Sequence, residues 1–305
     1  MPQSPPMTGP AFHLFLPQMR MTHEAIVDRA LAAEAAGFEG IAFMDHLAPP
    51  LALEHDMWEA MSIAGWVLAR TSTLRAGHLV LCDSLRHPAV LARQVTSLDH
   101  ASGGRFELGI GWGSVPEELE TFGVGATEPG ERADRLAESL EIMRRLWTGG
   151  VVDHLGEYFT LVGAQQRPVP TRRVTVTVGG VGKRTLEIAR AHADWLNVPV
   201  HHLDKLDDLR GRIGHLRVST QPMVALLPDE ASRDEVTALT RRRFGAGAMG
   251  RNLVIGTVPE LAGYFEGMHK RGVERFYVWF ADFAPVATLE RFAEVIAKIQ
   301  ATPAR

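Results

Sequence analysis

Short apolar runs alternate with longer amphipathic stretches along most of the chain. Eight of the short runs predict buried β-strands, at residues 11–16, 40–44, 76–81, 106–110, 174–178, 195–198, 222–226 and 275–280. Strands that alternate with helices form parallel sheets, and eight such units close into a (β/α)8 barrel. The pattern therefore predicts the α/β class and a TIM barrel. An open doubly wound sheet would show the same alternation, but the first strand lacks the glycine fingerprint of nucleotide-binding folds.

The stretches between the strands have the features of helices. In residues 22–36, Thr22 precedes an Ala-rich run and Gly37 follows it, as an N-cap and a helix terminator do. Residues 131–147 place apolar side chains at helical spacing. Another helix is predicted to begin at Pro88 and to end before Gly103, where a left-handed backbone conformation is cheap for glycine.

The 305 residues are predicted to form one barrel domain, 1–305. Three connections are longer than a barrel requires, at about 112–130, 150–173 and 228–257. Barrel active sites lie at the C-terminal ends of the strands, so we expect these connections to be loop insertions at that face. The last one carries three consecutive arginines, 241–243, which fit either a mobile basic lid or a solvated surface helix.

Composition narrows the classes of function. With 46% hydrophobic and 22% charged residues the chain is an ordinary globular protein, and its net charge of −4 gives no surface for nucleic acid. No apolar run is long enough to cross a membrane, and residues 1–10 lack the features of a signal peptide, so we expect a cytoplasmic protein. The single cysteine, Cys82, excludes an internal disulfide and a zinc-type cysteine cluster.

The best candidates for chemistry are Asp45 and His46, at the end of the second predicted strand. An imidazole titrates near neutral pH, and proton transfer at a barrel mouth needs such a group. A purely structural Asp-His pair is the alternative. A metal-dependent hydrolase is disfavoured, because the first strand holds a lone His13 instead of a His-x-His pattern, and no metal site is expected. Cys82 is disfavoured as a nucleophile, since no basic neighbour is evident.

Two glycine-rich loops follow predicted strands and let backbone approach a ligand closely. The first contains Gly109, Gly111, Trp112 and Gly113. The second precedes a helix that begins near Lys183, where backbone N–H groups and nearby cations suit a phosphate. Its candidate residues are Gly179, Gly180, Val181, Gly182, Lys183 and Arg184. Tight turns without a ligand remain the alternative for both loops.

Four runs in the same order resemble the luciferase-like monooxygenase superfamily of flavin-dependent and deazaflavin-dependent enzymes. They are GFEGIAFMDHL (37–47), RHPAVLARQVTSLDHASGGRFELGIGWG (86–113), TVTVGGVGKRTLEIARAHADWLNV (175–198) and VIGTVPELAGYFEGMHKRGVERFYVWF (254–280). The resemblance implies the TIM barrel, a bound flavin-type ring, a site near the second glycine loop for the cofactor's phosphate, and a homodimer.

The resemblance also implies roles at the second and third strands. His46 would lie beside the reactive ring and move the substrate proton, with Asp45, or alternatively Asp83, orienting its imidazole. A non-prolyl cis peptide or bulge between residues 81 and 84 would support the ring, which makes Cys82, Asp83 and Ser84 cofactor-binding candidates. Many relatives have Asn where Asp83 stands. Trp112 departs from the family pattern and is expected to stack near the ring or to pack beneath the long loop.

The cofactor decides the reaction that the resemblance implies. The preferred interpretation is an F420-dependent oxidoreductase that transfers a hydride between coenzyme F420 and a small organic substrate. The alternative is an FMN-dependent monooxygenase that uses reduced flavin and oxygen. Either enzyme could require a flavin or F420 reductase as a partner. A non-catalytic flavin-binding protein is the third interpretation.

Overall fold

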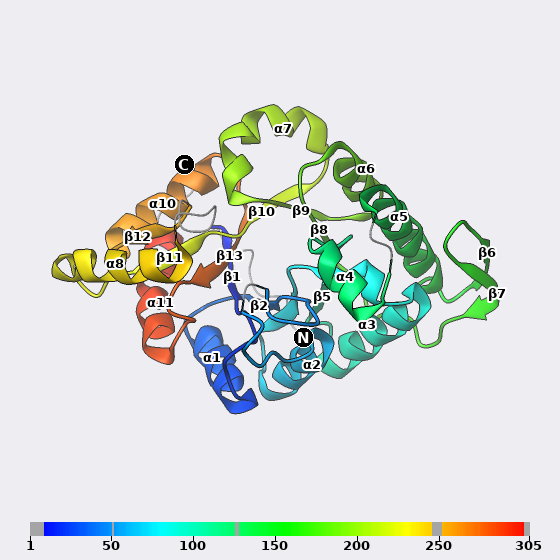
Figure 1. Ribbon diagram of the computed structural model, residues 1–305, viewed down its shortest axis with the longest axis horizontal. Coiled ribbons are helices and arrows are strands. Elements are labelled where there is room, and N and C mark those ends of the chain that lie inside the picture. Colours follow the sequence, from blue (N-terminus) through cyan, green and yellow to red (C-terminus); the bar gives the residue numbers. More distant parts are fainter. Residues whose placement is uncertain (1–8, 51, 126–127, 246–251, 302–305) are drawn as a thin grey trace.

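A computed structural model describes residues 9–50, 52–125, 128–245 and 252–301. Within these residues, eight parallel strands form a closed ring that is surrounded by helices (Figure 1). The ring is closed by pairing of the last strand with the first, Ala11 with Arg275 through Phe15 with Trp279. The predicted TIM barrel is therefore confirmed. In order around the ring the strands are β1 (Ala11–Phe15), β2 (Gly40–Phe43), β3 (Arg75–His78), β5 (Phe106–Gly111), β8 (Val176–Gly179), β9 (Trp195–Val198), β10 (Arg217–Thr220) and β13 (Arg275–Phe280).

The seventh barrel strand differs from the prediction. The predicted strand 222–226 corresponds to β11 (Met223–Leu226), whereas the ring is completed by β10, which pairs with both β9 and β13. β11 continues along β13 and pairs in turn with β12 (Val254–Gly256). Pro222 separates the two segments, because its nitrogen has no hydrogen to donate to a sheet ladder.

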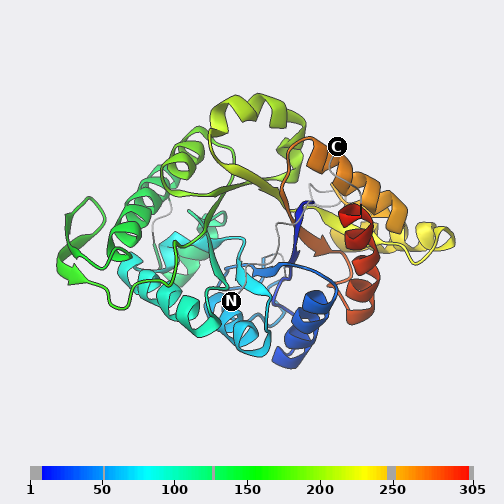
Figure 2. The same ribbon diagram turned by 180° about the vertical axis from the view of Figure 1, so that it is seen from behind.

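The helices lie outside the ring of strands, as views from both sides show (Figure 1, Figure 2). Thr22 caps α1 by accepting a hydrogen bond from the backbone N–H of Ala25, and Gly103 ends α3 with φ 67°, both as expected. The outer helices are α1 (His23–Ala35), α2 (Ala60–Arg70), α3 (Pro88–Ser102), α5 (Pro129–Leu146), α6 (Lys183–His192), α7 (Leu206–Ile213), α10 (Val258–Lys270) and α11 (Val286–Gln300). Within the described residues, 3-10 turns occupy Asp83–Leu85, Val200–Lys205 and Glu230–Ser232.

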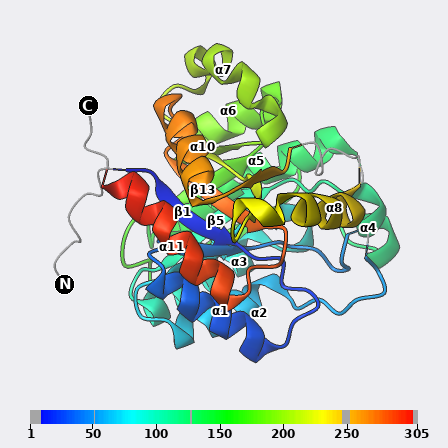
Figure 3. The ribbon, with the colours of Figure 1, turned by 90° about the vertical axis from the view of Figure 1, so that its left-hand side faces the viewer.

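Two of the long connections carry helices at the end of the barrel toward which the strands run (Figure 3). α4 (Pro116–Phe122) lies in connection 112–130, and α8 (Arg233–Phe244) lies in connection 228–257. Arg241, Arg242 and Arg243 are exposed on α8, which agrees with a surface helix. Residues 126–127 and 246–251 of these connections lie outside the described part.

The third long connection does not lie at the barrel mouth. It forms the antiparallel hairpin β6 (Val151–Leu155) and β7 (Thr160–Gln165), which follows α5 and precedes β8. A connection from a helix to a strand lies at the N-terminal end of the barrel strands, because the strand begins there. The expectation that 150–173 is an insertion at the C-terminal face was therefore wrong.

A buried ion network fills part of the barrel interior. Glu107 on β5 accepts hydrogen bonds from Arg75 Nε at 2.6 Å and from Arg275 Nη1 at 2.8 Å. Arg275 also lies over the ring of Trp195, 4.1 Å from its centroid. Burial alone would raise the pKa of Glu107, but the two guanidinium groups outweigh it and hold the pKa well below its ordinary range. The network therefore stabilises the fold above the unfolded-state pKa of ~4.3, and this stabilisation is lost as the pH falls below that value.

We expect Glu107→Ala to lower the free energy of unfolding by about 3–5 kcal/mol, because it leaves two guanidinium groups without their carboxylate. Urea denaturation at pH 7 measures the loss. The control is Glu274→Ala, which removes an exposed partner of Arg217 and is expected to cost about 1 kcal/mol or less. Equal losses in the two variants would show that the buried network does not stabilise the barrel.

Candidate active site

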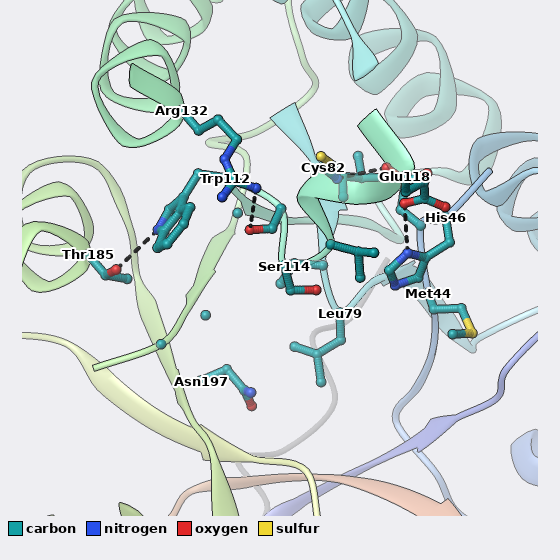
Figure 4. A pocket seen from close by; sticks show the side chains of 18 of the residues that line it. Met44, His46, Leu79, Cys82, Trp112, Ser114, Glu118, Arg132, Thr185 and Asn197 are labelled. Atoms are coloured by element: carbon teal, nitrogen blue, oxygen red, sulfur yellow. Dashed lines mark hydrogen bonds and ion pairs between the residues drawn. The ribbon is translucent and has the colours of Figure 1, made fainter. Parts of the chain in front are cut away.

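A cavity of about 560 Å³ opens at the C-terminal ends of the barrel strands (Figure 4). This volume is in the range of small-molecule sites. Its walls come from the ends of β2, β5, β8 and β9, from the segment after β3, and from α4 and α5. The lining residues are Met44, Asp45, His46, Leu79, Val80, Leu81, Cys82, Gly111, Trp112, Gly113, Ser114, Val115, Glu118, Leu119, Pro129, Arg132, Gly179, Gly180, Thr185, Asn197, Pro199 and Gln221.

The third barrel strand is interrupted at this cavity. β3 ends at His78, the peptide bond between Leu79 and Val80 is cis, and β4 (Leu81–Cys82) pairs again with β5. The cis bond expected between residues 81 and 84 thus lies earlier, before the chain rejoins β5. We call Leu79, Val80, Gly111 and Gly179 the Val80 wall.

Glycines let the interrupted strand approach its neighbour. A Cβ on Gly111 would lie 2.8 Å from Cγ2 of Val80, so only glycine leaves room for this side chain. A Cβ on Gly109 would collide with the carbonyl oxygen of His78. Gly109, expected to contact the cofactor, is instead a packing position and is absent from the described cavity lining.

Asp45 holds the ends of the second and third strands together. Its Oδ2 accepts hydrogen bonds from the backbone N–H of Cys82 at 2.7 Å and from Arg86 Nη1 at 2.5 Å, and its Oδ1 accepts one from Arg86 Nη2 at 2.9 Å. The side chain of Asp45 is only 3% exposed. Both oxygens are thus committed to the fold.

The partner of His46 is Glu118 on α4. Nδ1 of His46 lies 3.0 Å from Oε2 of Glu118, while Oε1 of Glu118 accepts hydrogen bonds from the backbone N–H groups of Leu47 at 2.7 Å and Ala48 at 3.1 Å. The expectation that Asp45 or Asp83 orients the imidazole was therefore wrong. Among the residues that the structure describes, none bonds to Nε2 of His46, which leaves this nitrogen for a ligand.

The three cofactor-binding candidates Cys82, Asp83 and Ser84 lie at different places relative to the cavity. Cys82 lines the cavity, whereas Asp83 and Ser84 are buried outside its lining. Asp83 lies 3.5 Å from Nε of Arg135 on α5, and burial raises the pKa of its carboxyl to about 6. Its carboxylate faces Arg135 of α5 and does not line the described cavity.

Trp112 joins two parts of the cavity wall. Its Nε1 donates to Oγ1 of Thr185 at 3.3 Å, and the guanidinium of Arg132 lies over its ring, 5.1 Å from the centroid. Gly113 lies directly against Cys82, where a Cβ would come within 2.8 Å of Sγ. Of the two alternatives for Trp112, the structure places the indole in the cavity wall, beside space that a ligand can occupy.

The second glycine loop reaches the cavity only in part. Gly179 and Gly180 line it, and so does Thr185 on α6, but Val181, Gly182, Lys183 and Arg184 are absent from the described lining. Lys183 is exposed, and Arg184 forms ion pairs with Asp134 and Glu187. The helix begins at Lys183 as expected, with Gly182 as its N-cap. A phosphate role for these four residues stays a prediction.

Several lining residues could not be selected from the sequence. Glu118 stands in the run PEELETFG, where nothing local distinguishes it from Glu117. Arg132 belongs to a helix whose pattern identifies only its apolar face. Asn197 did give a signal, because it is a polar residue inside the otherwise apolar strand β9.

Other kinds of site find no support in the described residues. There, no group of three or more His, Cys, Asp or Glu side chains could hold a metal ion. No described helix combines the length and apolar character required to span a bilayer.

Comparison with known proteins gives one family. Residues 7–302 match the family described as luciferase-like monooxygenase. An F420-dependent glucose-6-phosphate dehydrogenase of Mycolicibacterium fortuitum is 36% identical over 162 residues, which are 52% of this chain and 47% of that protein. The chain thus matches about half the length of this relative.

Solved structures share the fold at low identity. An F420-dependent secondary alcohol dehydrogenase in complex with an F420–acetone adduct superimposes with a TM-score of 0.82 at 19% identity, over 95% of this chain and 99% of that one. EDTA monooxygenase from Chelativorans sp. BNC1 gives 0.81 at 14% identity, over 97% of this chain and 95% of that one. Both deazaflavin and oxygen-using enzymes are therefore built on this barrel.

We expect Cys82 to react slowly with iodoacetamide in the folded protein, although it faces the cavity. Burial raises the pKa of its thiol to about 11, and only the thiolate is an efficient nucleophile. At pH 8 the labelling rate should be on the order of 10²-fold below that of the urea-unfolded chain. Mass spectrometry of the single cysteine measures both rates, and equal rates would mean that the thiol is neither buried nor protonated as described.

Proposed function

The chain belongs to the luciferase-like monooxygenase family, and on this premise we propose that it is an F420-dependent oxidoreductase, which transfers a hydride between F420 and a small organic substrate. The observation that carries the proposal is the His46–Glu118 pair at the cavity wall. Hydride transfer to a carbonyl, or from an alcohol, requires a group that moves one proton. An imidazole with a free nitrogen in the cavity suits this task.

The cavity residues fit a flat tricyclic cofactor. Along the Val80 wall, Gly111 and Gly179 lack side chains. The surface that would face the ring therefore consists of backbone and the apolar side chains of Leu79 and Val80. Gly180 and Thr185 would hold the polar tail beside the start of α6. When bound, F420 supplies or accepts the hydride.

Glu118 prepares His46 for proton transfer. Its carboxylate lies at hydrogen-bond distance from Nδ1, so a proton on Nδ1 would fix the tautomer and leave Nε2 to exchange a proton with the substrate. The same carboxylate binds the N–H groups of Leu47 and Ala48, which orders the backbone that follows the imidazole. In the reducing direction His46 gives its proton to the oxygen of the new alcohol, and in the other direction it takes that proton.

The F420 assignment is supported by sequence relatives more than by shape. Glucose-6-phosphate dehydrogenases that use F420 reach 34–36% identity over about half of the chain. The barrel itself accommodates either cofactor, because fold does not fix function. The monooxygenase alternative, with reduced FMN and a partner reductase, and a non-catalytic flavin-binding protein are therefore competing outcomes of the next experiment.

We expect the purified protein to bind F420 with micromolar affinity and FMN at least about tenfold more weakly, as titrations of both redox states followed by fluorescence would show. Tighter binding of reduced FMN would redirect the function to the monooxygenase. Binding of a cofactor without turnover of any alcohol, carbonyl compound or oxygen-dependent substrate would support the non-catalytic interpretation.

We expect His46→Ala to lower kcat by about 10²–10⁴-fold, the usual contribution of a general acid or base. Glu118→Gln should lower kcat as well, but it should cause little further loss in the His46→Ala background, because Glu118 acts through His46. F420 absorbance, followed with the best compound from a panel of alcohols and carbonyl compounds, measures turnover.

The matched control is Glu117→Gln. Glu117 is the exposed neighbour of Glu118 on the same helix, and it makes no described contact with His46. It should retain wild-type kcat. Full turnover of His46→Ala with an unchanged pH profile would contradict the proposed role of the imidazole. Additive losses of kcat in the double variant would show that Glu118 does not act through His46.

A further inference from the structure

A second cavity, of about 360 Å³, lies where α8, α11 and the ends of β11 and β13 come together. Its volume is at the lower end of the range of small-molecule sites. Figure 1 places α8, β11 and α11 on one side of the barrel, and α5 and α6 on the other. The second cavity shares no described lining residue with the candidate active site. Most of its lining is apolar and includes Leu226, Val236 and Leu239.

Two arginines line this cavity, and each is held there by a backbone carbonyl. Nη1 of Arg243 on α8 donates to the carbonyl oxygen of Ala281 at 3.1 Å. Nη2 of Arg291 on α11 donates to the carbonyl oxygen of Pro228, and its Nε is buried without a partner. Arg233, also on α8, forms ion pairs with two carboxylates, whereas in the described part of the chain no ion pair joins Arg243 or Arg291 to one. Both guanidinium groups therefore keep N–H donors for another acceptor.

The acidic residue of the described lining is Asp282, which follows β13. Its Oδ1 accepts a hydrogen bond from the backbone N–H of Ala284 at 3.0 Å, and its Oδ2 accepts one from the hydroxyl of Thr288 at 2.7 Å. Both oxygens are thus bonded within their own turn. With two arginines and one aspartate, the described lining carries one net positive charge.

We propose that the second cavity binds an amphipathic monocarboxylate, a molecule with one carboxylate and an apolar chain. The planar N–H donors of Arg243 and Arg291 match the geometry of a carboxylate, and both guanidinium groups line the same space. The apolar chain would lie against Leu226, Val236 and Leu239, where its removal from water is favourable. A single net positive charge is neutralised by a monoanion and exceeded by a dianion.

The ligand would connect the barrel to the long connection 228–257. α8 belongs to this connection, while α11 and the segment after β13 belong to the barrel. A molecule that contacts both holds α8 in place, and binding to the folded state raises the melting temperature by mass action. The run of three arginines on α8 is then divided in function, since Arg243 lines the cavity and Arg241 and Arg242 do not.

The test uses octanoate as the probe. Isothermal titration of the full-length protein at constant ionic strength, with thermal shift as a second readout, compares wild type with Arg243→Gln and Arg291→Gln. We expect wild type to bind octanoate with a Kd on the order of 0.1–1 mM, and each variant to bind it about fivefold or more weakly. Circular dichroism confirms that each variant is folded.

The matched control is Arg242→Gln, which removes an exposed arginine from the same helix but outside the cavity lining. It should bind octanoate as wild type does. Ala287→Trp should weaken binding while both arginines remain, because this exposed lining position can take a ring that fills the cavity. Acetate lacks the chain and octylamine has the opposite charge, so both should bind about tenfold more weakly than octanoate.

Three results would overturn the proposal. They are unchanged octanoate affinity in both Arg243→Gln and Arg291→Gln, an equal loss in Arg242→Gln, and displacement of octanoate by the cofactor that fills the candidate active site. The titration uses the protein without cofactor and does not depend on the proposed function. A protein that bound neither F420 nor FMN would fail that function and leave the octanoate result intact.

Discussion

The arrangement of the site depends on the bond between the Asp45 carboxylate and the third strand. Asp45 follows β2 and holds both Arg86 and the backbone N–H of Cys82. His46 comes directly after it, and Leu79 and Val80 of the Val80 wall lie shortly before Cys82 in the chain. One buried carboxylate therefore fixes the imidazole relative to the surface that is proposed to face the cofactor ring. Because its oxygens are used in this way, Asp45 is a positioning residue, and the proposed proton transfer is assigned to His46 with Glu118 as its partner.

The barrel interior and the mouth of the cavity hold different sets of charged side chains. Below the cavity, Glu107 is buried between two guanidinium groups, an arrangement that is stable only while all partners are present. At the mouth, Glu118 and Arg132 come from α4 and α5, which belong to or follow the long connection after β5. The barrel core thus sets the positions of the strand ends. The helices α4 and α5 at the mouth contribute the negatively charged Glu118 and the positively charged Arg132.

The sequence was sufficient where local patterns determine structure. Apolar runs of the expected length form β1, β5, β9 and β13. Thr22 caps the start of α1 and Gly103 ends α3, and both effects depend only on neighbouring residues. It was insufficient where long-range pairing decides. β10 is four residues long with only Val218 strongly apolar, so its identity comes from pairing with β9 and β13. The partners of His46 and Arg132 depend likewise on how distant elements pack.

Side chains of opposite charge lie on opposite sides of the cavity. Arg132 has no described carboxylate partner on one side, and Glu118 is paired with the imidazole on the other. An anionic end of a ligand is attracted to the first and repelled by the second, and both effects are strong where water is excluded. A flat ligand with one anionic end would therefore be expected to turn its uncharged part toward His46. The same charges would face a deazaflavin or FMN, so they do not discriminate between the two proposed cofactors, and the choice of reaction would rest on the ring chemistry beside the imidazole.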